Sequence, residues 1–235
     1  MIEQGKKHIL SMRMEVTYRY WVKKLRRIGN LTRDTSFAAL DVGCGVGNFL
    51  ERLEKWYPRA ELNGIDIADE SIILAGKKLN RTKLTTGDCS CLPYIDSCFD
   101  VVTAFQVIEH LKDPETFIIE ARRVLKCGGI FAITTPNPEG ICAQRLGNRW
   151  HGYIDDHISL NGISVWREMI ENSGFEIRSD GTTGLTGYGI FRKTPLALIN
   201  WIPMSICGYF PWRKGESYTV IAVKETKTGK NDLYS

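Results

Sequence analysis

The sequence predicts a doubly wound α/β fold, with a mostly parallel seven-stranded sheet and helices on both of its faces. Short apolar runs alternate with helical patterns over residues 37–135, and this order builds a parallel sheet. A glycine-rich turn at residues 43–47 (GCGVG) joins the first apolar run to a helical pattern. Two later runs end near an acid, at Asp66 and Asp88. Open α/β sheets bind their ligands at such strand ends.

The elements follow in order from the hydrophobic pattern. Short apolar runs predict strands at residues 37–42, 61–66, 83–88, 99–105, 130–135, 175–178 and 217–223. Helical spacing of apolar residues predicts helices over about 15–30, 48–57, 69–79, 113–127 and 161–173. The helical stripe at 48–57 includes Trp56. Asp69 and Asp113 are placed to cap their helices, and Gly128-Gly129 to stop one of them.

The chain is predicted to form a single domain, because 235 residues suffice for one substantial core. Residues 1–36 form a basic N-terminal helical segment and residues 37–135 the cofactor-binding core. Residues 136–216 supply a substrate-side loop, a helix and an apolar insertion, and residues 217–235 the last strand and a polar tail. Apolar residues make up 43% and charged residues 25%, as in ordinary soluble proteins.

Positive charge is concentrated at the N-terminus. The net charge is +4, but residues 1–36 carry nine Lys or Arg and three acids, a net +6 that leaves −2 on the remainder. Such a segment can contact nucleic acid or an anionic membrane. A solvated helix face is the favoured interpretation, and no nucleic-acid partner is expected.

The expected location is the cytoplasm. The first ten residues are polar and lack the apolar core of a signal peptide, and seven irregularly spaced cysteines fit a reducing compartment. No metal is predicted, because Cys89, Cys91 and Cys98 form no CxxC pair with a distant partner. The adjacent run Asp155-Asp156-His157 is also poor evidence for a cation site.

An uncharged apolar insertion covers residues 194–212. It is about long enough to span a bilayer, but Pro195, Pro203 and Pro211 interrupt it. We therefore expect no transmembrane helix there. An apolar cap over the substrate is favoured, and weak contact with a membrane surface is the alternative.

The residues around the glycine turn narrow the choice of cofactor. A dinucleotide fingerprint would place glycine at Asn48, so a dehydrogenase is the least favoured class. Asp66 follows Gly47 by 19 residues, where a carboxylate can accept hydrogen bonds from ribose hydroxyls. Asp88 is placed for an adenine amino group. No Lys-Ser/Thr phosphate loop is present, which disfavours a triphosphate.

Five motifs over residues 38–135 resemble the class I S-adenosylmethionine-dependent methyltransferases. They are LDVGCGVGNF, the acid in GIDI, GDCSCLPYIDSCFDVV, AFQVIEHLKDP and VLKCGGIFAITTPNP. The later NRWHGYIDDHISL and WREMIENSGFEI segments resemble, more loosely, the small-molecule branch that includes quinone-biosynthesis O-methyltransferases. The resemblance implies a Rossmann-like methyltransferase fold with S-adenosylmethionine as the cofactor.

The same resemblance assigns roles to residues. The glycines of the loop approach the methionine part of the cofactor, Asp66 binds the ribose, Ile67 packs on the adenine, and Asp88 lies at its edge. The residues assigned to the cofactor are Asp41, Gly43, Cys44, Gly45, Gly47, Asp66, Ile67, Asp88, Cys89, Ser90 and Gln106.

Methyl transfer from a sulfonium needs alignment of the reacting atoms more than a catalytic group. A hydroxyl acceptor is helped by a base, and the candidates are His157 first, then His151 and His110. The predicted function is methyl transfer to a small or lipid-like molecule, with oxygen favoured over nitrogen or carbon. The alternatives are an RNA or protein methyltransferase that docks through the basic segment, and a regulatory protein that binds the cofactor without turnover.

Overall fold

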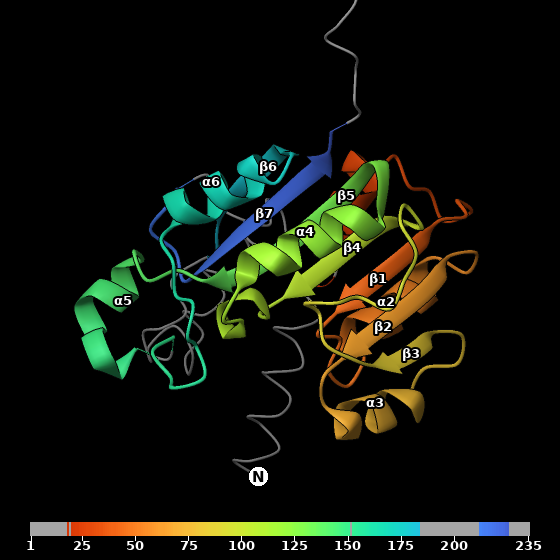
Figure 1. Ribbon diagram of the computed structural model, residues 1–235, viewed down its shortest axis with the longest axis horizontal. Coiled ribbons are helices and arrows are strands. Elements are labelled where there is room, and N and C mark those ends of the chain that lie inside the picture. Colours follow the sequence, from red (N-terminus) through yellow and green to blue (C-terminus); the bar gives the residue numbers. More distant parts are fainter. Residues whose placement is uncertain (1–17, 19, 151, 184–211, 226–235) are drawn as a thin grey trace, which may run out of the picture.

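The computed structural model describes residue 18 and residues 20–150, 152–183 and 212–225 (Figure 1). His151, most of the apolar insertion at 194–212 and the polar tail beyond residue 225 lie outside the described residues. Among the described residues, no helix is both long enough and apolar enough to cross a bilayer.

Seven strands form one sheet in the order β3-β2-β1-β4-β5-β7-β6. Their bounds are β1 Ala38–Val42, β2 Glu61–Asp66, β3 Lys83–Thr86, β4 Phe99–Phe105, β5 Leu125–Pro136, β6 Phe175–Thr182 and β7 Ser217–Lys224. Strands β1 to β5 pair in parallel, whereas β7 runs antiparallel to both β5 and β6. The predicted mostly parallel seven-stranded sheet is therefore confirmed.

Helices cover both faces of the sheet. Their bounds are α2 Asn48–Trp56, α3 Asp69–Gly76, α4 Pro114–Val124, α5 Ile141–Leu146 and α6 Ile163–Asn172, with short 3-10 helices η1 Ile108–His110 and η2 Gly147–Arg149. One core cluster packs α4 and α6 against the sheet. The other packs the helical residues 20–28, α2 and Ala75 of α3 against the opposite face. The sheet therefore lies between two apolar layers (Figure 1).

The strand order places the ligand-binding edge. Going out from β1, the chain proceeds to β2 and β3 on one side and to β4 and β5 on the other. At such a reversal the loops after neighbouring strands separate and leave a crevice at the carboxyl ends. The glycine turn after β1 and the loops after β2 and β4 meet at this point.

Three local predictions need correction. Ala68 is the N-cap of α3, and Asp69 is its first residue, because the Asp69 carboxylate accepts a hydrogen bond from the Thr86 hydroxyl instead (2.6 Å). Helix α4 ends at Val124, before Gly128-Gly129, because the buried Leu125 already pairs with Phe99 in the sheet. Asp113 does cap α4, as predicted, by accepting from the Thr116 amide (3.1 Å).

The third correction concerns Trp56. Phe49, Leu50 and Leu53 of α2 are buried, as the helical stripe predicts. Trp56 at the end of the same stripe is 44% exposed. The indole ring instead lines a surface pocket at the end of the helix.

Candidate active site

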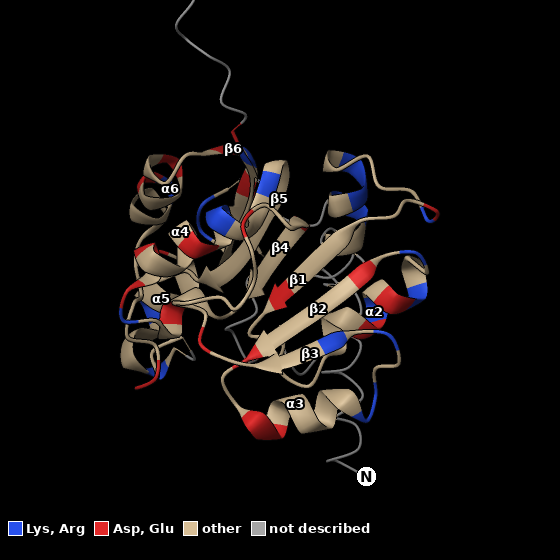
Figure 2. Cartoon of the chain, turned by 45° about the vertical axis from the view of Figure 1, so that its right-hand side comes forward, with Lys and Arg blue, Asp and Glu red and all other residues tan. Residues whose placement is uncertain are grey.

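A pocket of about 320 Å³ opens at the carboxyl ends of β1, β2 and β4. Its lining is Val42, Gly43, Ile65, Asp66, Ile67, Gly87, Asp88, Cys89, Gln106, Val107, His110 and Leu111. Figure 2 shows acidic positions in red at the arrowheads of β1 and β2. Six of the residues predicted for the cofactor thus lie around one cavity, although they come from four separate loops.

The backbone conformation of the glycine loop favours residues without a side chain. Gly43, Gly45 and Gly47 all have positive φ, between 52° and 73°, in the left-handed region that glycine adopts at low cost. A Cβ at Gly43 would overlap the Val107 side chain, whereas a Cβ at Gly45 would meet no atom within 4 Å. The loop is therefore closed against Val107 and open above Gly45.

Asp66 fastens this loop to the end of β2. Its Oδ2 accepts a hydrogen bond from the Gly45 amide (2.8 Å), and its Oδ1 accepts one from the Ala68 amide (2.9 Å). An ionised carboxylate has about four acceptor positions. Asp66 can therefore accept two further hydrogen bonds from a ligand without releasing the loop.

An exposed isoleucine and an acid also line the pocket. Ile67 is 76% exposed, which leaves a bare apolar surface for a flat ring. Asp88 lies in the turn after β3, and hydrogen bonds from the backbone and hydroxyl of Ser90 lower the pKa of its carboxyl. Asp88 thus stays ionised and acts as an acceptor. Ser90 does not line the pocket, but its backbone amide donates a hydrogen bond to the Asp88 carboxylate.

Asp41 lies beneath the glycine loop, outside the lining. It is only 4% exposed, and it accepts a hydrogen bond from the Thr103 hydroxyl (2.6 Å). Burial raises the pKa of Asp41 to about 7, the Thr103 hydrogen bond opposes this rise, and the negative charge of Asp66 adds to it. A cation bound above the loop would stabilise the ionised form.

Gln106 has an unusual backbone at the end of β4. Its φ is 59°, and its amide N–H donates to the Thr134 carbonyl (2.9 Å) while its side-chain amide donates to the Thr134 hydroxyl (3.1 Å). Non-glycine residues adopt this conformation at a cost, and such residues often lie at functional sites. The two bonds hold the Gln106 side chain at the rim of the pocket.

Not every predicted cofactor residue reaches the pocket surface. Asp41, Cys44, Gly45, Gly47 and Ser90 are absent from the lining and support residues that belong to it. The roles in cofactor binding that the sequence assigned to all eleven residues stay predictions. Leu111 was missed, because an apolar residue after a strand resembles a core residue in a sequence.

Two of the three candidate bases lie together beside the pocket. His110 lines it, and the His157 ring packs edge-on against His110 with a centroid distance of 4.7 Å. The Nδ1 of His110 lies 3.0 Å from the Asp156 carbonyl, and the Nδ1 of His157 lies 2.7 Å from the Gly152 carbonyl. A carbonyl oxygen only accepts, so we assign a proton to each Nδ1. Each Nε2 then carries a lone pair that can accept a proton.

Glu109 completes this cluster. Its side chain is fully buried. Burial raises the pKa of Glu109 to about 7 and outweighs hydrogen bonding from its own backbone and from the Thr135 side chain, which lowers this pKa. Ligand atoms of Glu109, His110 and His157 lie within 4.8 Å of one another, so these residues could also hold a divalent cation. The sequence gives no sign of the set, because His157 is remote from the other two along the chain.

The chain matches known methyltransferases. Residues 40–133 match the family model described as "Methyltransferase domain". A probable S-adenosylmethionine-dependent methyltransferase of Mycolicibacterium smegmatis is 36% identical over 67% of this chain and 56% of its own length. The malonyl-[acyl-carrier protein] O-methyltransferase of Legionella pneumophila is 32% identical over 53% of this chain and 46% of its own length. The chain thus spans about half the length of these curated relatives.

The fold is shared with solved methyltransferase structures. The phosphoethanolamine N-methyltransferase 2 of Haemonchus contortus in complex with S-adenosyl-L-methionine aligns with a TM-score of 0.60 at 19% identity, over 86% of this chain and 51% of that chain. The strand order and the pocket define a class of α/β proteins with a cofactor site at the strand ends. Within that class, the chain belongs to the class I S-adenosylmethionine-dependent methyltransferases, which confirms the predicted class, fold and cofactor.

The buried carboxyl of Asp41 predicts a pH-dependent stability. Its pKa in the folded protein lies above the ordinary value of 3.8. The contribution of Asp41 to stability should therefore fall as the pH rises from about 4 through 7, by up to about 4 kcal/mol. Asp41→Asn cannot ionise, so without cofactor it should be more stable than the wild type at pH 8 and similar to it at pH 4.

Urea unfolding at pH 4, 6 and 8 measures this difference. Asp34→Asn, at an exposed acid, is the matched control, and its difference in stability from the wild type should not change with pH. A constant difference between Asp41→Asn and the wild type across this range would refute the raised pKa.

Proposed function

We propose that this protein transfers the methyl group of S-adenosylmethionine to an oxygen atom of a small or lipid-like acceptor. The observation that carries the proposal is the His110 ring, which lines the cofactor pocket with its Nε2 lone pair free to accept a proton. Transfer to a hydroxyl releases one proton, and a base beside the donor meets this need. Transfer to a neutral amine needs less help, because the amine lone pair is already available.

The reaction is an in-line displacement at the methyl carbon. The acceptor oxygen forms a bond to that carbon as the bond from carbon to sulfur breaks, and the electron pair of that bond stays on sulfur. S-Adenosylhomocysteine leaves as a neutral thioether, and the acceptor proton passes to His110 Nε2. The sulfonium is an activated donor, so alignment of oxygen, carbon and sulfur is the main requirement.

His157 and Glu109 position the base in this proposal. The edge-on contact between the two rings limits rotation of His110, and the carbonyls of Asp156 and Gly152 fix both tautomers. A proton on His110 makes the ring cationic. The buried carboxyl of Glu109 lies close enough to stabilise that charge when it is ionised.

The lining supports a small acceptor with apolar parts. Beside the polar groups assigned to the cofactor, the wall carries Val107 and Leu111 next to His110. The predicted role of the apolar insertion at 194–212 as a cover belongs to the same proposal. The Legionella relative named for O-methylation of an acyl-carrier substrate fits an oxygen acceptor with a lipid-like group.

Removing the Asp66 carboxylate should weaken cofactor binding. Asp66→Asn retains one acceptor oxygen for the loop but loses the charge and the acceptor positions directed at the ribose. We expect S-adenosylmethionine to bind at least tenfold more weakly, or about 1.4 kcal/mol, by isothermal titration calorimetry. Glu61→Gln, at the opposite end of β2, is the control and should bind like the wild type. Equal affinities for the two variants would remove Asp66 from the cofactor site.

The chemical class of the methyl acceptor can be determined by fractionation, before the acceptor itself is identified. Methyl-labelled S-adenosylmethionine is incubated with the full chain and a host extract, which is then separated into lipid, small-molecule, RNA and protein fractions. We expect protein-dependent label in the lipid or small-molecule fraction. Label in RNA or protein would favour those acceptor classes instead. Cofactor binding without label in any fraction would favour a regulatory protein that does not turn over.

His110→Ala should lower turnover of the identified acceptor at least tenfold and leave S-adenosylmethionine affinity unchanged, because the base acts only on the acceptor. His157→Ala should lower turnover less, by freeing the His110 ring. His151→Ala tests the third candidate. Turnover of His110→Ala within about twofold of the wild type would exclude it as the base.

Treatment with a chelator distinguishes a general base at His110 from a cation site formed by the same cluster. Wild-type turnover that survives dialysis against EDTA supports the base. Turnover lost with EDTA and restored by a divalent cation would contradict the base and assign Glu109, His110 and His157 to a metal.

A further inference from the structure

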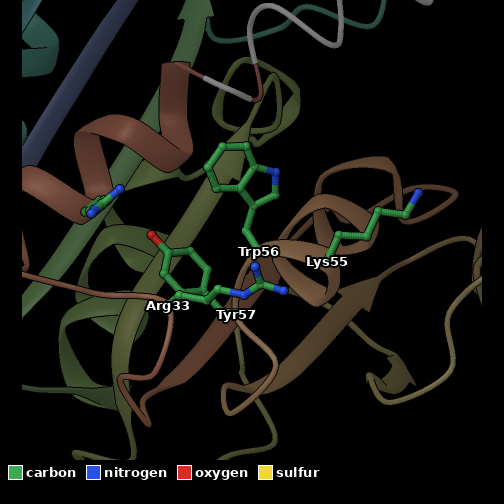
Figure 3. A pocket seen from close by; sticks show the side chains of 5 residues that line it. Arg33, Lys55, Trp56 and Tyr57 are labelled. Atoms are coloured by element: carbon green, nitrogen blue, oxygen red, sulfur yellow. The ribbon is translucent and has the colours of Figure 1, made fainter.

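A second pocket lies at the far end of α2 from the glycine loop. It has a volume of about 290 Å³ and is lined by Arg26, Arg33, Lys55, Trp56 and Tyr57. Gly47 of the loop caps the first turn of α2, whereas Lys55 and Trp56 close its last turn. The pocket is therefore separate from the cofactor site. Figure 3 shows Trp56, Tyr57 and Arg33 grouped together, while the Lys55 side chain extends away.

Two arginines supply positive charge that the fold does not use. Arg26 and Arg33 are both exposed, and within the described part of the chain neither guanidinium has a carboxylate partner. They are also not needed to cap α2. Arg81 donates to the carbonyls of Glu54 and Pro58 there (2.8 and 2.9 Å). Lys55 is already paired with Glu51.

Tyr57 lines the same pocket and carries a buried hydroxyl. Its side chain is 2% exposed, and its hydroxyl has no hydrogen-bond partner among the described residues. Burial raises the pKa of this hydroxyl, and the nearby Arg26 charge opposes the rise. Buried polar groups are nearly always satisfied. Among the described residues, the Tyr57 hydroxyl and the Arg26 guanidinium are thus neighbouring donors without an acceptor, and a bound anion would supply one.

Trp56 adds a flat apolar surface. The helical pattern predicts an inward-facing side chain, but the indole is 44% exposed and lines this pocket. Tryptophan faces stack on aromatic rings. The pocket thus combines donors for an anion with a stacking surface, in a volume near the lower end for small-ligand sites.

We propose that this second pocket binds a phosphate monoester that carries a heteroaromatic ring, the chemistry of a nucleoside monophosphate. The phosphate has up to two negative charges and three acceptor oxygens, which suit two guanidiniums and one hydroxyl. Guanidinium groups bind phosphate oxygens in pairs, and the ring stacks on Trp56. A single carboxylate would leave one of the arginines unmatched.

The test is isothermal titration calorimetry on the full chain with adenosine 5′-monophosphate. S-Adenosylhomocysteine is added first in excess so that the cofactor pocket is occupied. We expect adenosine 5′-monophosphate to bind at least tenfold more tightly than adenosine, which lacks the phosphate. It should also bind more tightly than ribose 5-phosphate, which lacks the ring.

Variants of the lining locate the binding. Arg26→Gln and Arg33→Gln should each weaken adenosine 5′-monophosphate at least fivefold. Tyr57→Phe, which removes only the unsatisfied hydroxyl and should fold normally, should weaken it about threefold. Trp56→Leu should abolish the preference over ribose 5-phosphate. Arg59→Gln, an exposed arginine beside α2 and outside the lining, is the control and should change nothing.

Three results would overturn the proposal. The first is no binding of adenosine 5′-monophosphate up to about 5 mM. The second is equal affinity of Arg26→Gln and Arg59→Gln, because the site would then lie elsewhere. The third is a 5′-phosphorylated oligonucleotide that binds far more tightly than the monophosphate and is sensitive to the same variants, which would assign the pocket to RNA. None of these results bears on the binding of S-adenosylmethionine.

Discussion

The hydrogen bond between the Asp66 carboxylate and the Gly45 amide holds the cofactor pocket together. It joins the loop after β1 to the end of β2, while the second oxygen of Asp66 fixes the next turn through Ala68. The glycines make this contact possible, because a Cβ at Gly43 would overlap Val107 and displace the loop. One acid thus sets the shape of the pocket and retains acceptor positions for the ligand.

The sequence predicted the parts of this site that depend on local order. Glycines between a strand and a helix, and acids at the ends of neighbouring strands, have a fixed place in a parallel sheet. Gly43, Asp66, Ile67, Asp88, Cys89 and Gln106 therefore line one pocket, as the motifs require. The parallel pairing of β1 to β5 follows from the same alternation of strands and helices. The antiparallel strand β7 was recognised as a strand, but its direction is a matter of tertiary structure.

The missed features depend on contacts between distant segments. Glu109 and His157 meet only because the loop before α6 returns over η1, where Ser159 donates to the Glu109 carbonyl (2.9 Å). Asp69 was predicted as the cap of α3, but its side chain accepts a hydrogen bond from Thr86 of β3, which is distant in the sequence. Trp56 continues the apolar stripe of α2 but is exposed and lines a surface pocket. The local sequence pattern around Asp69 or Trp56 is the same as that of an ordinary helix cap or core residue.

The exposed Ile67 gives the most direct test that the first pocket holds the adenine of S-adenosylmethionine. In a sample with labelled isoleucine methyl groups, S-adenosylhomocysteine is titrated and the Ile67 resonance is followed by NMR. Stacking of the adenine should shift this resonance strongly through the ring current, while Ile95 and Ile119, exposed and outside the lining, stay unchanged. An unmoved Ile67 at saturating ligand, or equal shifts at all three residues, would contradict the account.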